Sequence, residues 1–186
     1  MKLALASGAA LAIALMLPLH AQTMRQQNQQ NPAGNAPLTQ AERLTTEQFL
    51  DKAWNINQFE IQAGREAENK ATTGFRDYAR MIIEDHMKMN DELKSAIQKD
   101  AMKLPTTLDR EHQAQLDQLQ SASERNFDKQ FRTQQIEGHR QALQIFQAYA
   151  SNGDNAELKS FAQNSVATLQ RHLDQAEKLR EPSGVM

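Results

Sequence analysis

The chain has 186 residues, a formal net charge of −2 and no cysteine. The missing thiols exclude disulfides, thiolate chemistry and the cysteine-linked lipid anchor of bacterial lipoproteins. The mild charge argues against a nucleic-acid partner, because proteins that bind nucleic acids usually carry a basic patch or a high pI.

The first 21 residues have the pattern of a secretory signal peptide. Lys2 supplies a positive charge, an apolar run covers 3–17, and the small residue Ala21 precedes the expected cleavage point. The apolar run is shorter than the roughly 20 residues that a membrane span needs. We therefore predict export to the periplasm or the cell envelope. The alternative is that this segment is retained as an N-terminal anchor.

Three further parts follow the signal peptide. Residues 22–44 are rich in Gln, Asn, Pro and Gly, and they are predicted to form a disordered linker because they offer no apolar face. Residues 45–180 are predicted to form one helical domain, since their length suits a single hydrophobic core. Residues 181–186 are predicted to be a disordered tail after a Pro-Ser-Gly break.

Apolar residues recur at spacings of three and four through four long segments, which predicts four amphipathic helices. These helices are expected at about 45–70, 75–101, 124–150 and 155–179. Thr45 or Thr46 can cap the first helix. The second helix should end before Pro105, because proline disfavours a helical residue before it. The connection over 103–125 contains a short predicted helix at 108–119.

The predicted helices form two hairpins with short turns, joined by the long connection. This arrangement describes an all-α four-helix bundle with one crossover. No stretch of the sequence alternates between apolar and polar residues as a half-buried strand would.

Three histidines lie in the apolar stripes of three different predicted helices: His86, His139 and His172. Burying an imidazole without a partner costs free energy, so three of them directed at one interior predict a shared metal ion or a buried polar network. Glu60 lies on the inward face of the first helix, about as far before its turn as His86 lies after it. We predict one metal site formed by these four residues.

One feature fits this four-residue site less well than the others. His139 lies about 14 residues before the turn at Gly153, whereas His172 lies 19 residues after it. The mismatch of five residues corresponds to roughly 7 Å along the helix axes.

Neutral imidazoles with one carboxylate suit a single transition-metal ion such as zinc, copper or iron. A di-iron bundle requires Glu-x-x-His pairs, but the residues three before the histidines are Ile83, Ile136 and Leu169. The sequence therefore excludes a di-iron oxidase or iron store. It contains no glycine-rich phosphate loop and no nucleophile–base pair of credible spacing, so we predict no catalytic residues and find no sign of an enzyme.

Each candidate residue also has a structural alternative. The histidines and Glu60 can form a metal-free network of buried hydrogen bonds. Met89 shares the face of His86, either as a soft copper ligand or as core packing. Asp85 and Glu84 belong either to a solvated edge or to a set that orients His86. His112 lies in the polar connection, where we expect it to be solvated.

Several stretches resemble one bacterial family. They are Phe49-Leu50 through Glu60-Ile61, Tyr78 through His86, Leu104-Pro105-Thr106, Phe127 through Phe131, Glu137-Gly138-His139, and Leu169 through Leu173. Together they make residues Thr46 to Leu179 similar to the ferritin-like family called domain of unknown function 4142. The resemblance implies an exported, ferritin-like helical bundle, and it supplies no reaction. The chain departs from the family pattern at Arg171 and in its Gln-rich linker, and neither departure removes a candidate ligand.

Our leading hypothesis is a non-enzymatic periplasmic helical bundle that binds a transition metal. An alternative is an envelope interaction or stress-protection module with a metal-free histidine cluster, whose partner would be an envelope protein or a membrane surface. Such a module should expose an apolar patch around Trp54, Phe59 and Ile61, unless these residues pack against the connection. A third class is a redox enzyme with a single bound metal.

Overall fold

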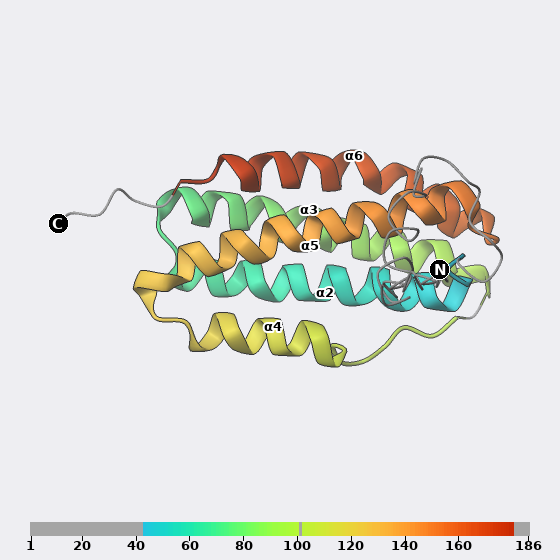
Figure 1. The fold of residues 1–186 in the computed structure, drawn as a ribbon. Helices are drawn as coiled ribbons and strands as arrows, with labels where there is room; N and C mark the ends of the chain where they lie inside the picture. The colour runs from blue at the N-terminus through green and yellow to red at the C-terminus, as the bar shows by residue number, and fades with distance from the viewer. Residues whose placement is uncertain (1–42, 101, 181–186) are drawn as a thin grey trace, which may run out of the picture. The chain divides into compact units, whose positions relative to one another are not determined.

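The computed structural model describes residues 43–100 and 102–180 (Figure 1). The predicted signal peptide at 1–21, the predicted linker up to residue 42 and the predicted tail at 181–186 lie outside the described residues. The described part contains helices and no strand, which confirms the all-α class. None of the helices in these ranges combines the length and the apolar character that a membrane crossing requires.

The helix bounds agree with the sequence pattern to within two residues, with one exception. The helices are α2 (Thr46–Lys70), α3 (Thr73–Ile97), α4 (Arg110–Ser121), α5 (Glu124–Asn152) and α6 (Ala156–Lys178), with a 3-10 turn η2 (Gln98–Asp100). The exception is the end of α3, which stops at Ile97 and continues as η2. At the start of α2, the Thr45 hydroxyl accepts from Gln48 N, and the Gln48 side chain accepts from Thr45 N, so both backbone donors are satisfied.

The four long helices pack in pairs around a common core (Figure 1). Consecutive helices form the hairpins α2–α3 and α5–α6, and α3 also packs against α6 while α2 packs against α5. Within the first hairpin the backbones come close at Gly64, where an added Cβ would lie 2.7 Å from Ile83 Cγ1. The core is therefore shared by both hairpins.

The core consists of two apolar clusters that follow each other along the helices. One cluster contains Phe49, Met89, Phe146 and Leu158, and the other contains Phe75, Ile82, Phe127 and Phe131. Along α3 the change from one cluster to the other falls between Ile82 and Met89, and along α5 it falls between Phe131 and Ala142. His86 and His139 lie at these changes, so the polar core residues separate the two apolar clusters.

The short helix α4 lies along the outside of α2 (Figure 1). Its buried side chains are Leu116 and Leu119. The connection before it covers Trp54, whose indole N–H donates to the Pro105 carbonyl. Phe59 is 2 % exposed and its ring lies 5.5 Å from the His112 ring. Trp54 and Phe59 therefore pack against the connection, and Ile61 is buried as well, so these three residues do not form an exposed apolar patch.

Candidate metal centre

His86 from α3, His139 from α5 and His172 from α6 meet in the core. Their exposed fractions are 0 %, 1 % and 0 %. Their ring centroids lie 5.2–5.7 Å apart, and one nitrogen from each ring lies within 4.8 Å of the other two. We call these three residues the histidine cluster. Among the described residues, it is the group of His, Asp or Glu side chains whose ligand atoms converge in this way.

The expected height mismatch between His139 and His172 is smaller in the structure than in the sequence argument. Helix α5 continues to Asn152, and the turn is centred one residue later than expected, near Asp154. This leaves a difference of about three residues, or roughly 4.5 Å. The imidazole rings bridge the remaining height difference because they face each other through different nitrogens. His139 Nε2 lies 3.2 Å from His172 Nδ1.

Each ring of the histidine cluster is held from outside by an oxygen acceptor. His86 Nδ1 lies 2.9 Å from Asn57 Oδ1, and His139 Nδ1 lies 2.9 Å from the Gln135 carbonyl. His172 Nε2 lies 2.8 Å from Asp85 Oδ2. A carbonyl oxygen and an ionised carboxylate accept only, so the outer nitrogens of His139 and His172 must be the protonated ones. Arg171 donates to the same Asp85 oxygen; partial burial opposes ionisation of this carboxyl group, but the hydrogen bonds from His172 and Arg171 outweigh it and lower its pKa.

These outer hydrogen bonds determine the state of the inner nitrogens. A neutral imidazole carries one proton, so His139 Nε2 and His172 Nδ1 both present lone pairs, although they are only 3.2 Å apart. The third inner nitrogen, His86 Nε2, is buried and has no hydrogen-bond partner among the described residues. Because Asn57 Oδ1 accepts from His86 Nδ1, His86 Nε2 is the unprotonated nitrogen of this ring as well. The histidine cluster therefore contains three unprotonated nitrogens, and the two that face each other repel unless a cation lies between them.

A proton is a poor candidate for that cation at neutral pH. Burial removes the rings from water and disfavours the charged form, which lowers the pKa of His139 to about 3 and the pKa of His86 well below its ordinary value. The same effect lowers the pKa of His172, although the Asp85 carboxylate opposes the shift. The arrangement therefore favours three neutral imidazoles.

Glu60, the fourth predicted site residue, lies beside the histidine cluster on the outer side of His139. Its Oε1 lies 3.7 Å from His139 Nδ1, and its Oε2 accepts from Gln135 Nε2 at 2.6 Å. The Gln135 Oε1 accepts from the Tyr78 hydroxyl at 2.9 Å, which fixes the orientation of the amide. Burial raises the pKa of Glu60 to about 8. The structure thus brings together the three histidines and places Glu60 next to the outer nitrogen of one of them.

Sequence reasoning missed three groups that hold the site: the Asn57 side chain, the Gln135 main-chain carbonyl and the Tyr78 hydroxyl. Asn57 and Gln135 are polar residues with 0 % exposure in otherwise apolar stripes, and that pattern was the available clue. Asp85 orients His172 rather than His86. His112 is half-buried and bound to Asp109 instead of being solvated, and Met89 packs in an apolar cluster.

Comparison with known proteins relates the fold to two solved structures and to one family. The structures are CopM in the Cu(II)-bound form (22% identity, TM-score 0.62) and in the Cu(I)-bound form (23% identity, TM-score 0.61). Each comparison covers 73% of this chain and 95% of the CopM chain, and it shows a common fold. The curated proteins gave no match. The model of the family described as domain of unknown function 4142 matches residues 21–179, so the chain belongs to that family.

Proposed function

We propose that this protein is an exported helical bundle that holds one transition-metal ion, copper in particular, in its histidine cluster. The observation that carries the proposal is the pair of unprotonated nitrogens, His139 Nε2 and His172 Nδ1, which face each other at 3.2 Å. A metal cation converts this repulsion into two coordinate bonds. The unpartnered His86 Nε2 supplies the third donor.

The spacing of the nitrogens suits such an ion. Metal–nitrogen bonds of about 2.0–2.1 Å place two ligands roughly 3.3 Å apart at a tetrahedral site, as for zinc, and roughly 2.9 Å apart at a square-planar site, as for Cu(II). At 3.2 Å the nitrogens of His139 and His172 lie between these two separations, and one nitrogen from each of the three rings lies within 4.8 Å of the other two. The outer hydrogen bonds to oxygen acceptors are those that fix the tautomer and orientation of metal-binding histidines. Glu60 would lie beside the outer nitrogen of His139, where its carboxyl group would offset the positive charge of the ion without binding it.

Copper is the first choice among the metals that imidazole binds. Cu(II) forms the most stable complexes of the divalent first-row series with nitrogen ligands. The structural neighbour CopM, which shares the fold, was solved with Cu(II) and with Cu(I). Zinc and iron remain the competitors that a titration must include.

The finer description of the fold and its location belong to the same proposal. The pairwise packing of α2, α3, α5 and α6, with the long connection through α4, supports a ferritin-like four-helix bundle with one crossover. The signal-like pattern at 1–21 supports export to the periplasm or envelope.

The first test is metal content and stoichiometry. The wild-type protein should bind one equivalent of Cu(II), and His86→Ala should bind none, because the variant loses one of three donors. His112→Ala is the matched control, since His112 lies outside the histidine cluster, and it should still bind one equivalent. Isothermal titration and elemental analysis after desalting measure both outcomes. A wild-type protein that takes up no copper, zinc or iron would leave the histidines as a metal-free polar core.

The second test concerns Asp85, which contacts His172 but not the proposed ion. Asp85→Asn weakens the acceptor that fixes the His172 tautomer, so copper affinity should fall by about 10–100-fold at unchanged stoichiometry. Glu84→Gln, on the exposed neighbouring position, should leave the affinity unchanged. Competition with a copper chelator of known affinity measures the difference. Equal affinities in both variants would contradict an orienting role for Asp85.

A further inference from the structure

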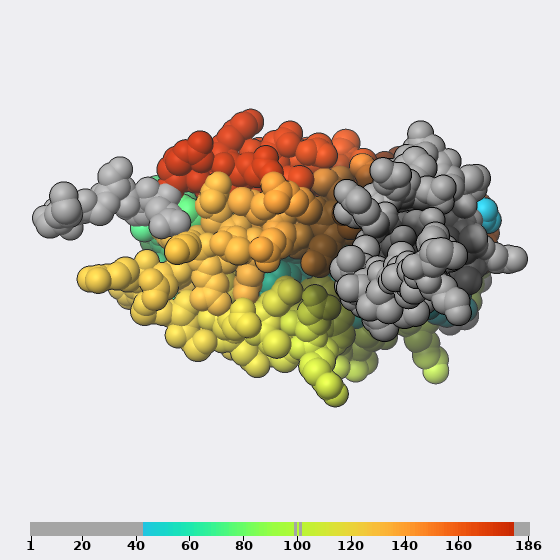
Figure 2. All heavy atoms as spheres, in the orientation of Figure 1, coloured from blue at the N-terminus to red at the C-terminus, as the bar shows by residue number. Residues whose placement is uncertain are grey.

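A cavity of about 100 Å³ lies between α2, α4 and α5, on the side of the core that α4 covers. We call it the α4 cavity; its lining includes Asp51, Glu60, Asp109, Glu111, His112 and Gly138. Figure 2 views this side of the molecule and shows a strip of α2 between α5 and α4. The cavity therefore reaches from the covering helix to the α2 residue that contacts the histidine cluster.

Glu60 forms the inner end of the α4 cavity. The residue is 2 % exposed, and its Oε1 receives no hydrogen bond from the described residues. The same oxygen lies 3.7 Å from His139 Nδ1. A buried carboxyl oxygen thus faces the cavity on one side and a cluster histidine on the other.

Gly138 keeps the space in front of that oxygen open. A Cβ at this position would lie 3.5 Å from Glu60 Oε1, and larger side chains would extend into the cavity that the residue lines. Glycine inside a helix costs about 1 kcal/mol relative to alanine. Glycine at this position of α5 therefore lowers the stability of the helix and leaves Glu60 accessible from the cavity.

The charge of the α4 cavity selects a cation. Besides the buried Glu60, its lining contains the acidic groups of Asp51, Asp109 and Glu111 against one lysine, Lys52. The remaining titratable group, His112, directs Nδ1 at the Asp109 carboxylate, 2.9 Å from each oxygen.

We propose that the α4 cavity is the route by which a transition-metal cation reaches the histidine cluster, with Glu60 as the last carboxyl contact before His139. This inference rests on the proposed function and adds the path of uptake to it. The competing path is the opposite side of the core, where the Asp85 side chain is 24% exposed and contacts His172 directly. The two paths predict different sensitivities of the uptake rate to substitution.

The first experiment blocks the α4 cavity. Stopped-flow mixing of the full chain with excess Cu(II) follows the quenching of Trp54, the single tryptophan, which lies in α2. Gly138→Leu should slow uptake at least tenfold and keep the final stoichiometry at one. Gly138→Ala, whose Cβ fits at ordinary contact distance, should change the rate less than threefold. Gly74→Leu makes the same substitution at a helical site with open space and should leave the rate unchanged.

The second experiment removes charge without filling space, and it decides the question if Gly138→Leu does not fold. Asp51→Asn combined with Glu111→Gln changes two exposed residues at the α4 cavity. At low ionic strength the pair should slow uptake three- to tenfold, and added salt should reduce the difference.

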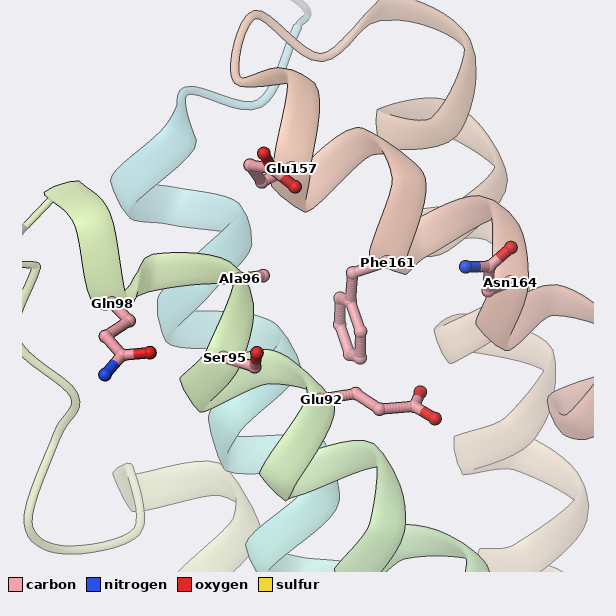
Figure 3. A pocket seen from close by; sticks show the side chains of 7 residues that line it. All are labelled: Glu92, Ser95, Ala96, Gln98, Glu157, Phe161 and Asn164. Atoms are coloured by element: carbon pink, nitrogen blue, oxygen red, sulfur yellow. The ribbon is translucent and has the colours of Figure 1, made fainter.

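The matched control for charge uses the groove between α3 and α6, which Figure 3 shows. Glu92→Gln combined with Glu157→Gln removes the same net charge there, and Glu157, like Glu111, lies in the first turn of its helix. In the described part of the chain, the side chains and carbonyl that hydrogen-bond the histidine cluster from outside belong to Asn57, Gln135 and Asp85, which do not line this groove. The control pair should leave the rate unchanged.

The outcomes separate the path from the function. Unchanged rates in Gly138→Leu and in the α4-cavity charge pair, at a stoichiometry of one, would overturn the proposed route and keep the metal site. Equal slowing by both charge pairs would mean that only net charge matters, and this also overturns the route. A wild-type protein that binds no metal would overturn the route and the proposed function together.

Discussion

The metal-free protein is expected to be most stable near pH 6.5 and to lose stability on both sides of it. The alkaline loss comes from Glu60, whose pKa rises from its ordinary value of 4.5 to about 8 in the folded state. Between these values the folded protein holds a proton that the unfolded chain has released, so stability falls as pH rises. Each pH unit corresponds to about 1.4 kcal/mol, which gives about 2 kcal/mol between pH 6.5 and pH 8.

The acid loss comes from the histidine cluster and has the opposite sign. The folded-state pKa of each cluster histidine is lowered from 6.5. Below pH 6.5 the unfolded chain therefore binds protons that the folded protein does not, and stability falls as pH decreases. This loss outweighs the opposite contribution of the single Glu60 because three histidines take part.

The Glu60→Gln variant tests the loss of stability at alkaline pH separately from the loss at acid pH. The variant keeps an oxygen acceptor for Gln135 Nε2 but cannot ionise, so its stability should stay level between pH 6.5 and pH 8 while the acid loss remains. Urea unfolding with a chelator present, at pH 5, 6.5 and 8, measures the free energy of unfolding on both sides of the maximum. Glu137→Gln removes an exposed carboxyl group of α5 and should follow the wild-type profile. A wild-type profile that is level up to pH 8 would contradict the neutral, buried state assigned to Glu60.

Phe49→Ala is expected to lower the free energy of unfolding by about 3–5 kcal/mol, the usual cost of removing a buried phenylalanine ring. Phe49 is 0 % exposed, stacks on Tyr149 with ring centroids 4.0 Å apart, and meets Phe146 edge-on at 5.2 Å. The cavity left behind has aromatic walls from α5, which cannot collapse onto α2 without moving the helix. For a domain of this size the melting temperature should fall by roughly 10–15 °C.

The same variant also tests whether the apolar core and the histidine cluster are separate units. Phe49 precedes Glu60 by 11 residues, or about 16 Å along α2. Phe49→Ala should therefore still bind one equivalent of copper at a temperature where it is folded. Met87→Ala, at a side chain that is 48 % exposed, should change stability by less than about 0.5 kcal/mol. Loss of copper binding in Phe49→Ala below its melting temperature would mean that the site depends on the whole core.

The positions of the helices and the inward direction of the three histidines could be predicted from the sequence. Spacings of three and four around His86, His139 and His172 determine a helical face, and short turns determine which helices are neighbours. The centre of the second turn was wrong by one residue, because α5 continues through Asn152 before the chain reverses. That shift removes about two of the five residues of the expected height mismatch between His139 and His172.

The partners of the histidines could not be predicted, because they depend on rotamers and on main-chain atoms of other helices. The Gln135 carbonyl binds His139 four residues later on the same helix, and no side-chain pattern reveals such a bond. Asp85 lies on the outer edge of α3, and its side chain binds His172 of α6 rather than the neighbouring residue His86. Helical periodicity also does not reveal whether Glu60 lies beside the inner or the outer nitrogen of His139, because the two positions differ only by about the width of the imidazole ring.

The distribution of the histidine cluster over the two hairpins has a consequence for the topology of the chain. His86 belongs to the first hairpin, whereas His139 and His172 belong to the second, at sequence separations of 53 and 33 residues. A cation bound by all three closes both loops at once, and closing loops of this length restricts the unfolded chain as a disulfide does. In a chain without cysteine, the metal would thus be a reversible cross-link whose presence follows the supply of the ion rather than the redox state of the compartment.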